Sequence, residues 1–395
     1  WLETGLSVTA STGPRARGLQ AEGQSALVLS AQSQSLSGAC LAMQGQSDSY
    51  VFFGYVDQLL LGEELARHGV VSVLDYFARD VELGLGAQLW LVREASAEEA
   101  VRSGGDQGVE ARLSTLQIDS EMGVATISRT AGEVYADLLE QDLDWLGLVW
   151  DEGGSTGGPN GPYYQSECAE IYASSFRKLE DRGLVYPCFC SRAQLHAASA
   201  PHTSDGNVIY PGTCRGLTAA EIAEKRKKKA PAYRLMVPDE EITFVDGCMG
   251  PHTENLLRDC GDFYLRRADG VFAYQLAVVV DDARMGVTEV VRGSDLLSST
   301  ARQLYLYRLL GLQAPGFAHC PLLLAPDGRR LSKRDGDQSL ENLREKYTAQ
   351  EIVGKLAYAY GLQPEPAPRT PESLIKDFSW AKVPKQDVCL PEDLF

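Results

Sequence analysis

Several features that mark other protein classes are missing from this 395-residue sequence. No apolar run approaches the roughly 20 residues that a membrane-spanning helix needs. The chain opens with Trp1 rather than Met, and its start lacks the basic-then-apolar pattern of a signal peptide. Its nine cysteines are an odd number and mostly scattered singly, which is not the pattern of a disulfide framework. We therefore expect a cytoplasmic protein, and no membrane anchor is visible in this chain.

Lysine is absent from the first part of the chain, and the first lysine of the sequence is Lys178. Residues 1–141 carry 8 arginines against 19 acidic residues, whereas residues 142–395 carry 29 basic against 35 acidic residues. This change indicates a domain boundary near Gln141, or a join between two unrelated genes. The total charge of −17 argues against a non-specific nucleic-acid binder. The basic run 225–229 is either a local RNA contact or the solvated end of a helix that begins near Ala219.

The first segment has the pattern of an α/β fold. Alternating polar and apolar residues predict a strand pair over 25–43, and apolar residues at helical spacing predict a helix over 56–67 that ends before Gly69. A second helix over 72–79 and a strand over 88–92 follow. The only histidine of this segment, His68, is explained by its place at a helix end. We find no catalytic constellation here.

In the second segment, a glycine ends a helix at Gly147, and a short strand and turn are predicted over 149–153. A later helix buries Tyr172, Phe176 and Leu179 and closes at Gly183.

Three cysteines in this segment have the spacing of a metal site. Cys188 and Cys190 form a C-x-C pair, and Cys214 follows after a loop. Two thiolates on one side of a tight turn can hold a tetrahedral ion, and a third closes the site. Tyr210, His196 and His202 are the candidates for a fourth ligand. Three buried thiols that act as small apolar side chains explain the pattern equally well.

Polar residues flank two apolar runs farther along. The run 276–280 predicts a buried parallel strand, with Tyr274 before it and Asp281 and Asp282 after it. A second short strand ends in Arg292, which could pair with a carboxylate in bidentate fashion. The alternative is an intramolecular ion pair between Arg292 and Asp281, Asp282 or Asp295.

A basic loop follows the turn Pro326-Asp327-Gly328. Arg330, Ser332 and Lys333 offer cations and a hydroxyl, which suits a reaction that expels pyrophosphate, because charge develops on the phosphates in the transition state. Basic turns are common, so the pattern alone is weak.

Taken together, residues 142–395 resemble the glutamyl-Q tRNA(Asp) synthetase family. Five motifs occur in the order of that family: D-L-D-W-L-G-L-x-W-D-E-G, C-x-C with Y-x-x-x-C, F-A-Y-Q-L-A-V-V-V-D-D, V-V-R-G-x-D-L-L and L-S-K-R. The resemblance implies a class I Rossmann-type α/β domain with a zinc-binding insertion. It also implies formation of glutamyl-adenylate from L-glutamate and ATP (with Mg²⁺), and glutamyl transfer to the queuosine of tRNA(Asp).

The resemblance assigns roles to individual residues. Cys188, Cys190, Tyr210 and Cys214 would hold Zn²⁺, so the family favours tyrosine over histidine as the fourth ligand. Tyr274 and Arg292 would bind glutamate. Lys333, with Ser332 and Arg330 in a KMSKS-like loop, would contact the ATP phosphates.

Residues 51–69 and 73–80 resemble the Ger(x)C family, the lipoprotein C subunits of spore germinant receptors. This resemblance covers about residues 5–141 and implies a structural or recognition role. The expected domains, from the N-terminus, are the Ger(x)C-like α/β segment 1–141, the remainder of the first half of the catalytic domain 142–186, the zinc-binding insertion 187–260, the second half with the KMSKS-like loop 261–345, and a short helical tail 346–395.

The sequence also departs from the synthetase pattern. The family's R-F-A-P-S-P-[ST]-G and H-x-G-[HN] motifs, which form the HIGH region, have no equivalent here, and the nearest match is the run 11–14. Cys168 stands where the family usually has arginine. We therefore expect reduced activity. A glutamyl-tRNA(Glu) synthetase fragment and a non-catalytic, spore-germination-related fusion protein are the alternatives, although the roughly sixty residues after Lys333 are too few for a separate anticodon-binding domain.

Overall fold

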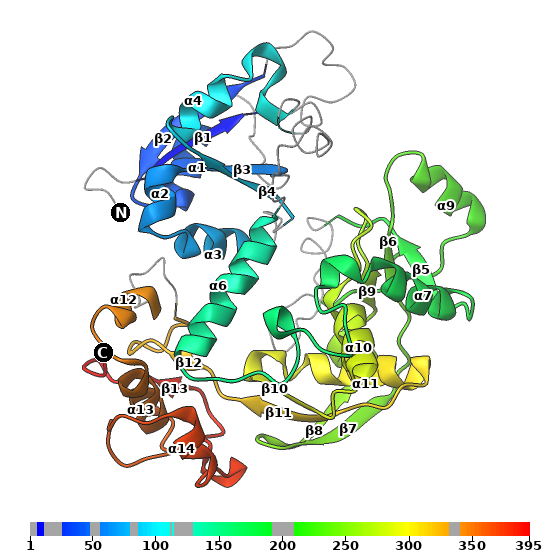
Figure 1. The fold of residues 1–395 in the computed structure, drawn as a ribbon. Coiled ribbons are helices and arrows are strands. Elements are labelled where there is room, and N and C mark those ends of the chain that lie inside the picture. Colours follow the sequence, from blue (N-terminus) through cyan, green and yellow to red (C-terminus); the bar gives the residue numbers. More distant parts are fainter. Residues whose placement is uncertain are drawn as a thin grey trace. The chain divides into compact units, whose positions relative to one another are not determined.

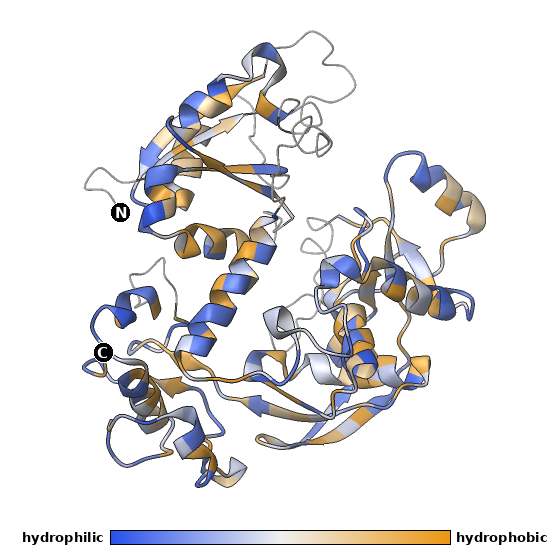
Figure 2. Cartoon of the chain, in the orientation of Figure 1, coloured by the Kyte–Doolittle hydropathy of each residue, from blue (hydrophilic) through white to orange (hydrophobic). Residues whose placement is uncertain are grey.

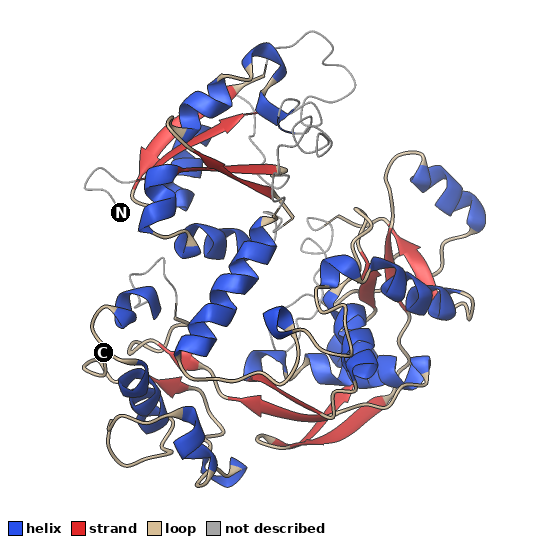
Figure 3. Cartoon of the chain, viewed as in Figure 1, coloured by secondary structure: helices blue, strands red, loops and turns tan. Residues whose placement is uncertain are grey.

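The protein is described by a computed structural model that divides into two compact units, up to Trp145 and from Leu146 onward. Each unit is described by itself (Figure 1). The structure describes residues 6–11, 26–47, 56–79, 86–110, 113, 129–191, 209–331 and 340–395. Figure 3 shows that both units mix helices and strands.

Within the residues that the structure describes, the first unit contains two small sheets with helices packed on them. Strand β1 (Leu6–Ser11) pairs with β2 (Val28–Ser33) in antiparallel fashion, and β3 (Gln58–Gly62) pairs with β4 (Gln88–Val92) in parallel. The helices are α1 (Leu36–Gln44), α2 (Glu63–His68), α3 (Val71–Arg79), α4 (Ala97–Arg102) and α6 (Ala131–Trp145). Leu61, Val73 and Phe77 form one core cluster. Burying these apolar side chains is what holds such small sheets together.

The structure confirms part of what the first segment predicts. Strand β4 has the predicted bounds, and α3 begins one residue before the predicted helix. The strand pair predicted over 25–43 is wrong, because its second half is α1, which Ser35 caps by accepting from the Gly38 N–H at 3.1 Å. The helix predicted over 56–67 is wrong in its first half, which is β3. Short apolar runs satisfy both periods, so tertiary packing decides between them.

The described part of the second unit contains four separate sheets. Strands β5 (Val185–Cys188), β6 (Ala232–Leu235) and β9 (Phe263–Arg266) form an antiparallel sheet, and β7 (Glu241–Asp246) and β8 (Gly250–Asn255) form a hairpin. Strands β10 (Glu289–Gly293) and β11 (Gly316–Cys320) pair in parallel, as do β12 (Leu323–Leu324) and β13 (Val388–Cys389).

Three helices form the main core of this unit. They are α7 (Ala169–Glu180), α10 (Tyr274–Met285) and α11 (Ser299–Leu310), and they pack on one another. The predicted inner face of α7 is confirmed, because Tyr172, Phe176 and Leu179 are all buried in one cluster with Leu276 and Leu306. Polar and apolar residues are mixed along the helices and strands of both units, as amphipathic elements require (Figure 2).

The remaining elements are short helices. They are η1 (Gly105–Gln107) in the first unit, and η3 (Gly154–Thr156), η4 (Gln165–Glu167), α9 (Ala219–Arg226), the π-helix η5 (Leu256–Cys260), η6 (Ser294–Leu296), α12 (Leu340–Arg344), α13 (Ala349–Ala359), α14 (Pro371–Ile375) and η8 (Trp380–Lys382) in the second. Helix α9 begins at the predicted residue, Ala219. The strand predicted over 149–153 is wrong, since only an isolated bridge joins Gly153 to Gly157. Among the described helices, none is both long and apolar enough to span a bilayer.

The parallel strand predicted over 276–280 is also wrong, because these residues lie inside helix α10. Leu276, Ala277, Val279 and Val280 are all buried, so nearly every side of this helix faces the core. A helix buried on all sides has no polar face to reveal its period, and its apolar run looks like that of a central strand. Gly286 ends the helix with a φ of +70°, a left-handed conformation that glycine adopts without a Cβ clash.

A buried hydrogen bond joins α7 to α10. The Tyr172 hydroxyl donates to Asp281 Oδ2 at 2.6 Å, and Gln165 Nε2 donates to the same oxygen at 3.1 Å. Asp281 Oδ1 is buried and accepts no hydrogen bond within the described residues. Arg284 NH2 forms an ion pair with Oδ1 at 3.6 Å, which is too long for a hydrogen bond. The hydrogen-bond donors to this buried carboxylate therefore matter for stability.

We predict that Tyr172→Phe lowers the free energy of unfolding by about 1–3 kcal/mol, because it removes a donor from a buried carboxylate. Chemical denaturation followed by circular dichroism measures this change. Tyr358→Phe is the matched control, since Tyr358 is 37% exposed, and its effect should stay within about 0.5 kcal/mol. Equal effects of the two substitutions would contradict the prediction.

Candidate functional site

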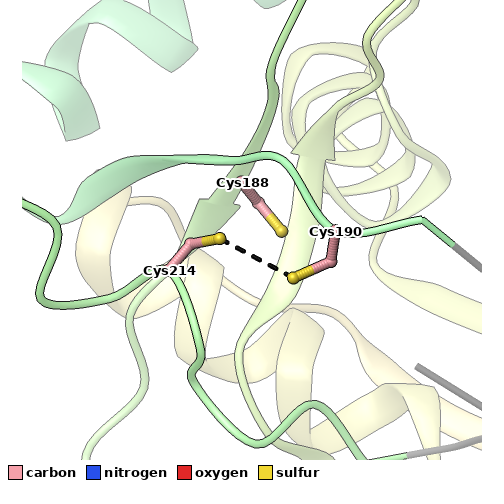
Figure 4. Close-up of side chains that lie close together, drawn as sticks. All are labelled: Cys188, Cys190 and Cys214. Atoms are coloured by element: carbon pink, nitrogen blue, oxygen red, sulfur yellow. Dashed lines mark hydrogen bonds between the residues drawn. The ribbon is translucent and has the colours of Figure 1, made fainter. Parts of the chain in front are cut away.

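Three cysteines converge at the end of strand β5. Cys188 is the last residue of β5, Cys190 follows it, and Cys214 arrives from a separate segment. Their sulfur atoms all lie within 4.8 Å of one another, and Cys190 Sγ is 3.6 Å from Cys214 Sγ (Figure 4). The Tyr210 hydroxyl lies 3.6 Å from Cys188 Sγ and 3.7 Å from Cys190 Sγ. Four potential ligand atoms therefore surround one point.

The spacing of these atoms suits a tetrahedral ion. Zinc–sulfur bonds of about 2.3 Å place the corners of a tetrahedron roughly 3.8 Å apart. The distances of 3.6 and 3.7 Å within the cluster are close to that value. The rival ligands His196 and His202 lie outside the described residues. The residues present therefore fit a zinc ion.

A buried arginine lies beside this cluster. Arg234 on β6 is only 4% exposed, and its guanidinium carbon lies 3.8 Å from the ring centre of Tyr210 and 3.7 Å from that of Tyr264. Although burial alone raises the pKa of Cys188, the Tyr210 hydroxyl and Arg234 lower it by stabilising the thiolate. Because the thiolate is the form that binds metal, this positive charge favours metal binding.

Arg292 lies near the end of β10, as the sequence predicts. Its Nε donates to His319 Nε2 at 3.0 Å, and its NH2 donates to Thr300 Oγ1 at 3.0 Å and to the Leu296 carbonyl at 3.4 Å. Its NH1 is buried and has no partner among the described residues. Arg292 therefore keeps one nitrogen available for a ligand.

The ion pairs offered as the alternative explanation of Arg292 are not found among the described residues. Asp281 accepts from Tyr172, and Asp282 accepts from the Tyr307 hydroxyl at 3.3 Å. Asp295 lies 3.8 Å from Arg330 NH1. Each aspartate is thus directed to another group. Burial raises the pKa of Asp282, against the lowering effects of Tyr307 and the Arg292 charge.

Among the described residues, the Tyr274 side chain makes no hydrogen bond with Arg292, and the two residues are linked only through their neighbours. It is the first residue of α10, is 45% exposed, and precedes Gln275, whose Nε2 donates to Ser299 Oγ at 3.0 Å. Ser299 adjoins Thr300, which accepts from Arg292. The starts of α10 and α11 and the end of β10 therefore meet at one place.

The basic loop is only partly described. Arg330 forms an isolated bridge with Leu324 and is largely exposed. Ser332 and Lys333 lie outside the described residues. The contacts of these three residues with the ATP phosphates therefore stay predictions.

The sequence did not indicate the roles of Asp246 and His319. His319 accepts a hydrogen bond from Arg292, and Asp246 contacts His319. His319 Nδ1 lies 2.6 Å from Asp246 Oδ2, and both side chains are fully buried. A signal was present, because a histidine within the apolar run 317–320 must find a buried hydrogen-bond partner. The identity of that partner, 73 residues away, could not be read from the sequence.

Comparison with known proteins identifies the family. Residues 127–371 match the family model for the catalytic domain of class I tRNA synthetases (E and Q). The chain belongs to this class I synthetase family. Residues 4–131 match a second family model, the spore germination protein N-terminal domain. The two matches meet at 127–131, in front of the boundary predicted near Gln141, and the domain boundaries stay predictions.

Individual relatives support membership of the synthetase family. The chain is 53% identical over 257 residues to a glutamyl-Q tRNA(Asp) synthetase from Symbiobacterium thermophilum, which covers 64% of this chain and 79% of that protein. It is 49% identical over 263 residues to another from Nitratidesulfovibrio vulgaris, which covers 66% and 81% of the two chains.

A solved structure supports the class I synthetase fold. A glutamate tRNA ligase from Elizabethkingia meningosepticum is 27% identical, with a TM-score of 0.55. The match covers 67% of this chain and 58% of that ligase, so the chain spans little more than half of its length. The α/β catalytic fold expected from the motifs is thereby confirmed.

We predict that stability of this synthetase depends on His319 protonation. Burial lowers the pKa of His319 from its usual 6.5, and the nearby Arg292 charge adds to this, although Asp246 opposes it. Below pH 6.5 the unfolded chain binds a proton that the folded chain resists, so stability falls as the pH decreases toward the lowered value.

The free energy of unfolding, measured at several pH values from about 7.5 to 5.5, checks this prediction. His319→Gln has no imidazole at this position and should show a shallower loss on acidification than the unsubstituted chain. Parallel curves for the two proteins would contradict the prediction.

Proposed function

We propose that this chain activates L-glutamate with ATP and transfers the glutamyl group to the queuosine of tRNA(Asp). The observation that carries the proposal is Arg292, whose NH1 is buried and has no hydrogen-bond partner in the described part of the chain. A buried guanidinium with an open donor strongly favours an anionic ligand such as a carboxylate. Two relatives that share about half of their matched residues with this chain are named glutamyl-Q tRNA(Asp) synthetases.

The binding roles follow from the positions of the side chains. Arg292 NH1 would donate to a carboxylate of glutamate, with one nitrogen available rather than the pair expected from the sequence. Tyr274 is exposed at the start of α10, and its hydroxyl would contact the same glutamate. A charge-assisted hydrogen bond of this kind contributes about 1.5–3 kcal/mol to binding.

The nucleotide would be bound by the basic loop. Lys333, with Ser332 and Arg330, would contact the phosphates of ATP and its Mg²⁺ complex. Cations that reach the phosphates stabilise the charge that develops as pyrophosphate leaves. The expectation of reduced activity, based on the missing HIGH region, stays a prediction.

We also propose a structural zinc held by Cys188, Cys190, Tyr210 and Cys214. A bound zinc would fix the end of β5 to the turn at Cys214, which already contact each other where the Phe189 N–H donates to Cys214 Sγ at 3.5 Å. Lys229 Nζ lies 3.4 Å from the carbonyl oxygens of Phe189 and Cys190, which adds a second positive charge near the cluster.

The test of the substrate is binding of a stable glutamyl-adenylate analogue, because binding needs no turnover. We expect Arg292→Ala to weaken the affinity at least about tenfold, which corresponds to about 1.4 kcal/mol. Arg258→Ala is the control, since Arg258 is exposed and pairs with Asp239 at 3.0 Å, and it should leave the affinity unchanged. No binding by the unsubstituted chain would overturn the proposed substrate.

The test of the zinc is elemental analysis of the purified chain, which should give about one zinc per molecule. Cys214→Ser should reduce this content and lower the melting temperature, and Tyr210→Phe tests the fourth ligand. Cys320→Ser is the control, because Cys320 lies at the end of β11 and outside the cluster. A metal-free chain of unchanged stability would contradict the proposal.

A glutamyl-tRNA(Glu) synthetase is the second candidate. A glutamate–tRNA ligase from Halorhodospira halophila is 46% identical over 225 residues, although the match covers only 46% of that protein. Charging assays separate the two: transfer to queuosine-containing tRNA(Asp) supports the first function, and transfer to tRNA(Glu) supports the second. A non-catalytic, spore-germination-related role rests on the match of residues 4–131. It predicts no charging of either tRNA.

A further inference from the structure

Arg292 is one of three polar side chains that contact one another in a row and come from three different strands. Asp246 ends β7, His319 lies in β11 and Arg292 lies in β10. The Asp246 carboxylate lies 2.6 Å from His319 Nδ1, and the other imidazole nitrogen, Nε2, lies 3.0 Å from Arg292 Nε. These contacts join the β7–β8 hairpin to the parallel pair that carries Arg292.

The direction of each hydrogen bond is determined by chemistry. A guanidinium has only donors, so His319 Nε2 must be the acceptor and cannot carry a proton. The proton of the neutral imidazole therefore lies on Nδ1, which donates to Asp246 Oδ2. One tautomer alone satisfies both neighbours.

Asp246 is itself held in place. Its Oδ1 accepts from the backbone N–H groups of His319 at 3.0 Å, Cys248 at 3.0 Å and Met249 at 2.8 Å. Burial alone raises the pKa of Asp246, but these bonds and the one to His319 outweigh burial and lower it. The carboxylate therefore stays charged and keeps accepting from His319.

Aromatic packing restricts the imidazole further. The Phe317 ring is stacked on His319, with an interplanar angle of 14° and 6.3 Å between ring centres, and Arg292 lies over the same Phe317 ring at 5.3 Å. With both side chains of the Asp246–His319 pair fully buried, no water competes for these bonds. Arg292 is therefore held at Nε by His319 and at NH2 by Thr300 and Leu296, whereas NH1 is buried and lacks a hydrogen-bond partner among the residues that the structure describes.

We propose that Asp246 and His319 are positioning residues that orient Arg292, so that its NH1 meets a carboxylate of the amino-acid substrate. This inference rests on the proposed function for the identity of the ligand. The orientation of Arg292 itself rests only on the contacts. A guanidinium that is already fixed loses little conformational entropy on binding, so the pair strengthens substrate binding without touching the substrate.

The first test is the tautomer of His319, which nitrogen-15 NMR of histidine-labelled chain reports directly. We expect a protonated Nδ1 and an unprotonated Nε2 at pH 7. In Asp246→Asn, the side-chain amide keeps an oxygen for the backbone donors but turns its NH2 toward Nδ1. This should shift His319 to the Nε2–H tautomer and set two donors against each other. An Nε2–H tautomer in the unsubstituted chain would overturn the proposal.

The second test separates positioning from stability with two substitutions of one residue. His319→Asn places an amide NH2 near the position of Nδ1 and keeps the bond to Asp246, but it removes the acceptor for Arg292. His319→Gln places its amide oxygen near the position of Nε2 and keeps that acceptor, but it gives up the bond to Asp246. We expect His319→Asn to weaken binding of the glutamyl-adenylate analogue about 10- to 100-fold, and His319→Gln to weaken it less.

The melting temperatures should follow the opposite order, because His319→Gln leaves the buried Asp246 carboxylate short of a donor. Affinities that merely follow the melting temperatures would show a structural role only and overturn the positioning role. His252→Gln is the control, since His252 contacts Glu254 at 2.9 Å rather than Arg292, and it should leave the affinity unchanged.

The two tests also separate this inference from the proposed function. If the unsubstituted chain binds no analogue, the proposed substrate fails. The tautomer and the Arg292 Nε–H signal still report whether the three side chains are joined as described. An Arg292 Nε–H that exchanges rapidly with water, and is unaffected by His319→Asn, would overturn the positioning role whatever the substrate.

Discussion

Burial of charge is the constraint on which the second unit depends. Asp246, Asp281 and Arg234 are all buried, and an isolated charge in such surroundings costs about several kcal/mol or more. Each one is therefore matched to particular donors or acceptors: Asp281 to Tyr172, Asp246 to His319, and Arg234 to two tyrosine rings and the Asp262 carbonyl. These directional contacts join elements that apolar packing alone would leave free to slide.

The same constraint explains why the two candidate sites differ in character. At the cysteine cluster, Arg234 and Lys229 bring positive charge toward the sulfur atoms, which favours the thiolate form that a metal ion needs as its ligand. At Arg292 the surrounding groups are neutral acceptors, namely an imidazole nitrogen, a hydroxyl and a carbonyl. The arginine charge there is oriented but not neutralised, so that place favours an anion.

The family matches and the compact units divide the chain at two different places, which lie about one helix apart. The two family matches meet at 127–131, whereas the compact units divide after Trp145. Helix α6 (Ala131–Trp145) runs without interruption between these positions and packs against α3 of the first unit. The synthetase match therefore begins just before a helix that belongs to the first unit by its contacts, and it includes that helix. A sequence seam and a structural boundary need not coincide, because a helix packs wherever its apolar face finds a partner.

The sequence by itself determined the family, the cluster of three cysteines, the inner face of α7 and the placement of Arg292 in a strand. These follow from local spacing or from motifs, which act over a few residues. It did not determine that 276–280 is a helix, because a helix surrounded by core has no polar face. Nor could it join Asp246 to His319, 73 residues apart, or show that Arg292 would find neutral partners instead of an aspartate. Hydrogen bonds between distant segments depend on where the folded backbone brings them, and only the tertiary structure decides that.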